Sequence, residues 1–158
     1  MEPISRKELE TFIGPKSKTS FYTKALDKYF TNPNKPIWCW PAALVNLFWF
    51  GFRNAHIVML LLFAGYFSIF FVTLFISPII AISLIAIIIL LCGLFGINIY
   101  FDYAVKEISK IKENHLGTSE EKILNAIERR GGVSYKIPVF IYILFAGVML
   151  AFINFIQS

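Results

Sequence analysis

Charge is absent from a long central part of the chain, since residues 54–101 contain no Asp, Glu, Lys or Arg. As a single helix this stretch would be roughly 70 Å long at about 1.5 Å per residue, more than twice a hydrocarbon core of about 30 Å. Two passes through a bilayer fit, and one pass does not. Ser77-Pro78 is the expected turn, because proline starts a helix well and disfavours helical geometry in the residue before it. The sequence predicts a membrane hairpin with spans at about residues 57–76 and 79–100.

Charged residues are also scarce overall, at 16% of the chain against about a quarter in soluble domains. Residues 137–156 form another uncharged stretch that is long enough to cross a bilayer. The first apolar segment begins near Ile37, behind a polar, charged leader that is unlike a cleaved signal peptide. We therefore expect three spans, with the first one retained in the mature protein.

Lysine and arginine are missing from the Ser77-Pro78 turn and from the tail after residue 156. All 15 of them lie before the first span or in the loop between the second and third spans. Positive residues in short loops are retained in the cytoplasm, so the N-terminus is predicted to be cytoplasmic and the C-terminus external. The net charge of +5 borders membrane segments, which favours anionic lipid over nucleic acid as the counter-charge.

Cysteine and histidine are scarce, with two of each. His56 and His115 have no neighbouring ligand at metal-binding spacing, and we interpret both as interfacial polar residues. Cys39 and Cys92 both approach the predicted cytoplasmic half, where disulfides rarely persist, so we expect unpaired thiols. No nucleotide-binding or nucleophile-elbow pattern is present. The sequence thus predicts no metal site, no cofactor and no enzyme.

The three predicted spans lack ionisable residues, apart from His56 at one edge. Proton and ion pathways commonly use such residues, so a proton-coupled transporter is disfavoured. Small residues in the spans allow helices to approach closely, either within one chain or between copies in a homo-oligomer. The candidate packing residues are Gly65, Gly93, Gly96, Gly147 and Ala151.

Aromatic residues are plentiful and gather near the predicted cytoplasmic ends of the spans. Tryptophan and tyrosine favour the headgroup level of a membrane, and Arg53 places a charge at the same level just before the first span. The candidate interface anchors are Trp38, Trp40, Trp49, Arg53, Tyr100, Tyr103 and Tyr135.

A tryptophan-rich apolar segment at residues 37–54 precedes the hairpin. A helix from Pro41 to Phe52 would be about 18 Å long, too short to span. A span here would also place the basic residues of the loop between the second and third spans outside the cytoplasm. We predict a helix that lies flat in the cytoplasmic interface or enters the membrane part-way. Asn46 is its only strongly polar helical position, so it is not an ordinary amphipathic surface helix.

Three short patterns flank or lie within these segments. They are Phe12-Ile13-Gly14-Pro15-Lys16, the Trp38-x-Trp40-x-Ala42-Ala43 run closing at Trp49 and Arg53, and Gly131-Gly132-Val133-Ser134 after a short helix. Together they resemble the domain-of-unknown-function 2628 family of small bacterial inner-membrane proteins. The resemblance covers most of the chain and implies a bacterial inner-membrane location. It supplies no catalytic residue.

Two cytoplasmic stretches have the apolar periodicity of amphipathic helices. One covers residues 21–30, and the other ends near Arg130 after a predicted capping box of Thr118 with Glu121. Each either covers the protein's own cytoplasmic face or docks a partner or lipid. The candidate partner or lipid contacts are Phe21, Tyr22, Lys24, Lys28, Tyr29, Arg129 and Arg130.

The chain is thus predicted to be an all-α integral membrane protein with three transmembrane helices, an interfacial or re-entrant helix and short amphipathic cytoplasmic helices. Its expected segments are a cytoplasmic N-terminal region (1–36), the tryptophan-rich helix (37–54), the hairpin (55–100), a cytoplasmic helical loop (101–136) and the third span with an external C-terminus (137–158). We hypothesise a non-enzymatic scaffold that binds a protein partner or anionic lipid through its cytoplasmic face. The alternatives are an oligomeric channel or small transporter and, third, a membrane-embedded enzyme.

Overall fold

The regular secondary structure of the described part of the chain is all helix. The computed structural model describes residues 3–75, 77–136, 138–140, 143 and 147, and these contain no strand. Most of the predicted third span, including Ala151, lies outside the described residues. The all-α prediction is therefore confirmed for the part of the chain that the structure covers.

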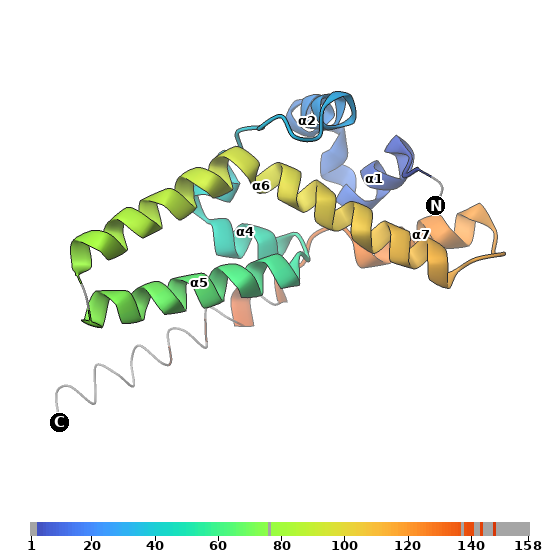
Figure 1. Cartoon of the computed structure of the whole chain (residues 1–158). Coiled ribbons are helices and arrows are strands. Elements are labelled where there is room, and N and C mark those ends of the chain that lie inside the picture. The colour runs from blue at the N-terminus through green and yellow to red at the C-terminus, as the bar shows by residue number, and fades with distance from the viewer. Residues whose placement is uncertain (1–2, 76, 137, 141–142, 144–146, 148–158) are drawn as a thin grey trace.

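The longest helix of the described residues is α6 (Pro78–Asn114), and the other helices are arranged along it. It follows α5 (His56–Phe75), and the two helices form an antiparallel hairpin (Figure 1). Ser77 is the N-cap of α6 in extended geometry and Pro78 is its first residue, as the sequence predicts. At 37 residues, α6 is about 55 Å long, so it extends well beyond a bilayer core of about 30 Å.

Helix α6 is the one helix among the described residues that is long and apolar enough to cross a membrane. The apolar stretch His56–Phe70 of α5 is shorter. Of the three predicted spans, the described structure therefore supports only the second one, which lies in α6. Only 22% of the apolar window of α6 is buried inside the protein, unlike the core helix of a soluble domain. Large apolar side chains that face outward on this hairpin include Ile57, Leu60, Leu61, Phe67, Ile79, Ile82, Ile87 and Leu90.

The N-terminal segments are α1 (Arg6–Ile13), a 3₁₀ turn (Pro15–Lys18) and α2 (Ser20–Thr31). Helix α1 packs on the second half of α6, and α2 contacts α6 through Tyr29. Ser5 and Glu8 form a reciprocal capping box at the start of α1, with donor–acceptor distances of 3.2 and 2.7 Å. We call the helices α1, α2 and α7 and the second half of α6 the collar. Its buried core contains Leu9, Phe12, Ile13, Ala25, Leu26, Phe101, Ala104, Ile108 and Ile127.

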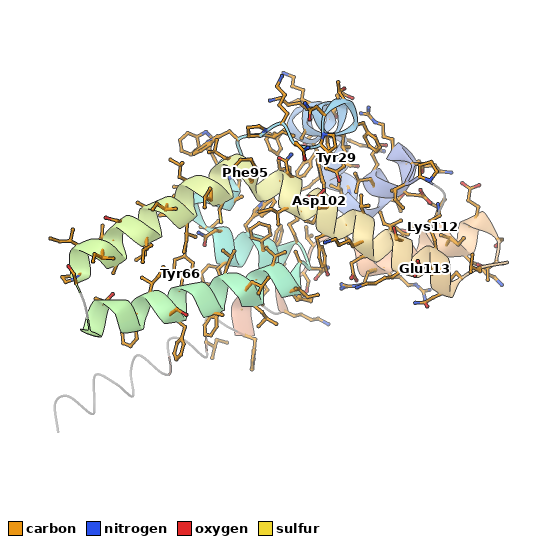
Figure 2. All side chains as sticks on the ribbon, viewed as in Figure 1. Tyr29, Tyr66, Phe95, Asp102, Lys112 and Glu113 are labelled. Atoms are coloured by element: carbon orange, nitrogen blue, oxygen red, sulfur yellow. The ribbon has the colours of Figure 1, made fainter. Side chains whose placement is uncertain are left out.

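An extended segment after α2 runs against α6 and bonds to its backbone. The amide of Ile37 donates to the carbonyl of Leu94 at 3.0 Å, and that of Cys39 donates to Gly93 at 2.8 Å. The Asn98 side chain donates to two carbonyls of the same linker, at 2.6 and 3.1 Å. Helix α6 changes direction here, with Phe95 at the bend (Figure 2). Part of the polar backbone of the linker is therefore paired with α6.

The tryptophan-rich segment forms two short helices instead of the single helix predicted from Pro41 to Phe52. These are α3 (Trp40–Leu44) and α4 (Asn46–Phe52). Val45 leaves helical geometry between them, with φ −123° and ψ 32°. The break arises because the Asn46 side chain accepts from the Leu47 amide at 2.6 Å and donates to the Tyr66 hydroxyl at 2.6 Å.

The last described helix of the collar is α7 (Glu120–Arg130), which packs on α1 and α6. Its N-cap is Ser119, without a side-chain cap bond, so the predicted capping box of Thr118 with Glu121 is wrong. The Thr118 hydroxyl instead donates to the His115 carbonyl at 2.7 Å, which turns the chain after α6. Arg129 and Arg130 do lie in the last turn, where positive charge complements the helix dipole.

Candidate functional site

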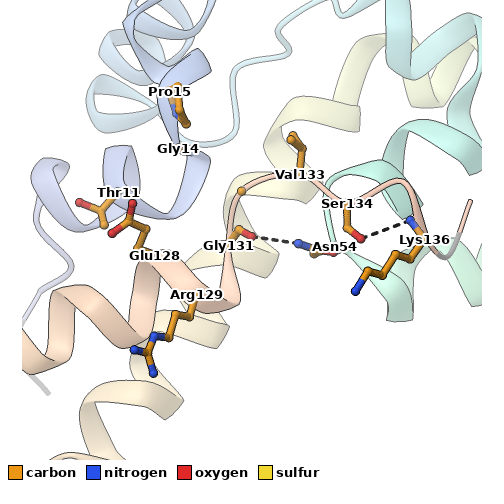
Figure 3. A pocket seen from close by; sticks show the side chains of 11 residues that line it. Thr11, Gly14, Pro15, Asn54, Glu128, Arg129, Gly131, Val133, Ser134 and Lys136 are labelled. Atoms are coloured by element: carbon orange, nitrogen blue, oxygen red, sulfur yellow. Dashed lines mark hydrogen bonds between the residues drawn. The ribbon is translucent and has the colours of Figure 1, made fainter.

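Three segments that are far apart in the sequence meet where α4 turns into α5 (Figure 3). The amide of Gly132 donates to the Phe12 carbonyl at 2.7 Å. The Asn54 side chain donates to the Gly131 carbonyl at 2.9 Å, and the amide of Ser134 donates to the Phe52 carbonyl at 2.9 Å. These bonds fasten the loop after α7 to the end of α1 and to the turn before α5. We call this contact the glycine junction.

Glycine is required at the junction because the two backbones touch. A Cβ added at Gly131 would lie 2.1 Å from the Phe12 carbonyl oxygen, and the obstacle is backbone that cannot rotate away. Gly14 and Gly132 adopt φ values of 79° and 71°, in the left-handed region that favours glycine. Asn54 is also left-handed, with φ 57°, a conformation that asparagine tolerates.

An open cavity of about 530 Å³ lies beside the glycine junction. Its wall combines the end of α1, the Asn54 turn, the end of α7 and the loop that follows. Two basic residues, Arg129 and Lys136, and one acid, Glu128, line it. Within the described residues neither basic side chain makes an ion pair. Figure 3 shows both of them extending to the same side of the Gly131–Asn54 hydrogen bond.

Arg53 lies in the interior next to this junction, only 2% exposed. It donates to the Tyr22 hydroxyl and, at 3.4 Å, to the carbonyl of Ile13, the last residue of α1. Its guanidinium also stands 4.6 Å from the ring centre of Tyr22 and 5.6 Å from that of Tyr100. The cation is thus held by aromatic faces and by the negative end of α1, with no acidic partner among the described residues.

Tyr22 stays a neutral hydroxyl in this arrangement. Burial, which the charge of Arg53 only partly opposes, raises the pKa of Tyr22 to about 12. The hydroxyl can therefore accept the hydrogen bond from Arg53 at any pH in the physiological range. This interaction ties α2 to the turn before the hairpin.

A second polar cluster joins α7 to α6. Arg130 donates to the Glu107 carboxylate at 2.8 Å and to the Tyr103 hydroxyl at 2.7 Å. Lys110 contacts the same carboxylate at 3.0 Å. Burial alone raises the pKa of Glu107, but the hydrogen bond from Lys110 and the charge of Arg130 outweigh it and hold that pKa below its usual value. The carboxylate is therefore charged at neutral pH and stabilises the collar.

No protein-family model matches this chain. No curated protein and no solved structure matches it either. The resemblance to the domain-of-unknown-function 2628 family therefore stays a prediction. The structure brings two of the segments that carry the resemblance, residues 12–16 and 131–134, into direct contact at the glycine junction.

The predicted interface anchors fall into two groups. Trp38, Trp40 and Tyr135 are exposed, by 38%, 63% and 68%. The two tryptophan rings meet edge to face, with centroids 5.1 Å apart. The other four anchors are buried in the protein, where they pack against one another and the N-terminal helices; they are Trp49, Arg53, Tyr100 and Tyr103. The three aromatic residues of this group therefore contribute to the buried core of the protein.

The predicted partner or lipid contacts also divide. Phe21, Lys24 and Arg129 are exposed, and Lys28, also exposed, donates to the Pro36 carbonyl at 3.3 Å. The remaining three contact other parts of the protein. Tyr22 binds Arg53, Tyr29 donates to Asp102 at 2.7 Å (Figure 2), and Arg130 binds Glu107.

The packing glycines of α6 contact the tryptophan-rich segment. A Cβ at Gly93 would lie 2.7 Å from the Trp38 ring, and one at Gly96 would lie 2.6 Å from the Ala42 Cβ. Added Cβ atoms at Gly65 and Gly147 meet nothing within 4 Å in the described structure. The glycines that allow close helix packing therefore lie where α3 and the residues just before it cross α6.

The described residues contain no group of three side chains that could hold a metal ion. Cys39 and Cys92 are free and buried. The glycine junction itself was not predicted from the sequence. A run of two glycines after a helix signals a turn, but nothing local indicates which distant backbone it will contact.

Proposed function

We propose that this protein is a non-enzymatic integral membrane protein whose collar binds a protein partner or anionic lipid at the cytoplasmic surface. One observation carries the proposal, namely the division of α6 into two halves. Its first half and α5 expose large apolar side chains, whereas α1, α2 and α7 cover its second half. An apolar surface of this extent is unfavourable in water and suits a lipid environment.

The proposed topology has the hairpin and residues 137–156 as spans, with the N-terminus in the cytoplasm and the C-terminus outside. The distribution of lysine and arginine supports this orientation, since all 15 lie in the collar, its linkers or the span ends. In this proposal α5, whose 20 residues would be about 30 Å long, is the first span, although its described apolar stretch, His56–Phe70, is shorter.

We further propose that α3 and α4 enter the membrane part-way and return. Asn46, at the bend between them, bonds to Tyr66 in the middle of α5. Leu44 and Val45 at the same bend are exposed by 72% and 51%, which suits contact with lipid tails. In the extended segment before α3, the amides of Ile37 and Cys39 are bonded to α6, which suits irregular backbone at membrane depth.

A binding role is supported by the way the collar uses its ionisable groups. The buried Arg53, the Glu107–Arg130 pair and the Glu8–Lys112 pair at 3.0 Å all link one helix to another. Such links make a rigid platform. Exposed cations, Arg129 among them, are left on its surface for a partner or a membrane.

Two experiments test the proposal. Alkaline carbonate washing of native membranes should leave the protein in the membrane fraction, and a reporter fused after Ser158 should be active outside the cytoplasm. Release by carbonate would overturn membrane insertion, and a cytoplasmic reporter would overturn the three-span topology.

The scaffold role is tested by comparing partner capture with solute flux. Crosslinking in native membranes followed by purification should recover a defined protein or anionic lipid with the chain. Purified protein in liposomes should not carry solutes. Robust flux would instead establish the oligomeric channel or transporter.

A further inference from the structure

The cavity at the glycine junction lies at the level where the spans meet the collar. The Asn54 turn in its wall immediately precedes α5, and Lys136 immediately precedes the predicted third span. Pro138 of that segment approaches Gly51 of α4, since a Cβ at Gly51 would lie 3.2 Å from the Pro138 ring. In the proposed topology the cavity therefore opens at the height of the lipid headgroups.

We propose that this cavity binds the phosphate of an anionic phospholipid, with Arg129 and Lys136 as its cationic contacts. This inference rests on the proposed membrane topology. The two side chains are exposed and unpaired within the described residues, and one acid, Glu128, lines the same cavity. The wall thus carries a net positive charge beside a rigid backbone loop. Basic pockets near helix ends on the cytoplasmic side suit lipid headgroups.

The neighbouring side chains favour a lipid over a free phosphate compound. Val133 and Tyr135 on the loop are exposed by 42% and 68%, and the Tyr135 ring lies 4.7 Å from that of Phe52. Val139 and Phe140, directly after Lys136, are exposed by 51% and 66%. An amphiphile matches this arrangement, because its phosphate meets the cations while its acyl chains lie along the apolar residues.

The loop is preorganised for this role. Gly131, Gly132 and Ser134 are each bonded to a different fixed backbone or side chain, at 2.7 to 2.9 Å. Their conformation is therefore set before a ligand arrives, so the loop loses little conformational entropy on binding. Arg130, which precedes them, is held by Glu107 and is not available to the cavity.

Native mass spectrometry of the full chain in detergent tests the assignment, with phosphatidylglycerol, phosphatidylcholine and glycerol 3-phosphate as probes. The key variant is Arg129→Gln with Lys136→Gln. The matched control is Lys24→Gln with Lys28→Gln, which removes the same charge from the exposed surface of α2. Each variant is first compared with the parent for its unfolding temperature.

The parent should bind one phosphatidylglycerol more tightly than phosphatidylcholine. The cavity variant should weaken this binding roughly tenfold to thirtyfold, as expected for two basic contacts at a membrane surface, and the α2 variant less than about threefold. Equal losses in both variants would mean diffuse charge attraction and would overturn the site. Equal binding of the two lipids would also overturn it.

Two further outcomes would redirect the assignment. Tight binding of glycerol 3-phosphate would identify a soluble phosphate ligand and overturn the lipid. Loss of a captured protein partner in the cavity variant, without a change in lipid selectivity, would identify a protein-binding site. Retention in carbonate-washed membranes, together with an externally active reporter after Ser158, separates all these results from failure of the proposed membrane insertion and topology.

Discussion

Replacing Gly96 by alanine probes the closest approach between α3 and α6. The added Cβ would lie 2.6 Å from the Ala42 Cβ, whereas carbon atoms in contact are ordinarily about 3.5–4.0 Å apart. The short helix α3 must therefore move away by about 1 Å. That movement also stretches the hydrogen bonds from the Ile37 and Cys39 amides to α6.

The expected magnitude follows from two opposing effects. Overpacking of this kind costs about 1–3 kcal/mol, while alanine in place of glycine within a helix contributes about 0.5–1 kcal/mol. Gly96→Ala should therefore lower the free energy of unfolding by up to about 2.5 kcal/mol. Gly65→Ala is the matched control, because nothing in the described structure lies within 4 Å of its added Cβ. It should be neutral or stabilising.

Denaturant unfolding in detergent, followed by tryptophan fluorescence, measures both variants, since all 3 tryptophans lie in or beside α3 and α4. The double variant Gly96→Ala with Ala42→Gly removes the clashing methyl group and should recover most of the lost stability. The reasoning is refuted if Gly96→Ala is as stable as Gly65→Ala, or if Ala42→Gly gives no rescue.

Three other predictions concern polar contacts and the glycine junction. Tyr66→Phe removes the bond to Asn46 and should cost about 0.6–1.7 kcal/mol in the same unfolding assay; an unchanged stability would argue against the re-entrant bend. Gly131→Ala forces a Cβ onto the Phe12 carbonyl and should expose α7 to hydrogen exchange, and exchange like that of the parent would contradict the backbone contact. Because the pKa of Glu107 is depressed in the folded protein, its stabilising effect is fully present above the unfolded pKa of about 4.3 and is lost as pH falls through the folded value. The protection of α7 against hydrogen exchange, relative to the intrinsic exchange rate at each pH, should thus fall as the pH drops below the unfolded pKa in the parent, and Glu107→Gln should remove part of that dependence.

Several features could be predicted because they depend on local composition. The helix start at Pro78, a helix within Ser20–Thr31 and the end of α7 at Arg130 follow from proline geometry, apolar spacing and paired glycines. The Ser5–Glu8 capping box has a clear sequence pattern as well, although the prediction had placed a box at Thr118 instead.

Residue roles at the candidate site could not be predicted in the same way. Arg129 and Arg130 are adjacent and chemically identical, yet one lines the cavity and the other binds Glu107. Arg53 was predicted as a membrane-interface anchor, and the sequence does not indicate that its side chain is buried against Tyr22. The difference depends on which distant helix each side chain meets.

The sequence by itself determined that the protein is helical, that it contains an apolar hairpin turning at Ser77-Pro78 and that its basic residues lie to one side of that hairpin. These properties are local, because they depend only on the order of charged, apolar and turn-forming residues. The tertiary structure alone decided that residues 12–16 and 131–134 form one junction, that α3 lies on Gly93 and Gly96, and which cations remain unpaired. Those outcomes depend on contacts between segments far apart in the chain, which no local pattern encodes.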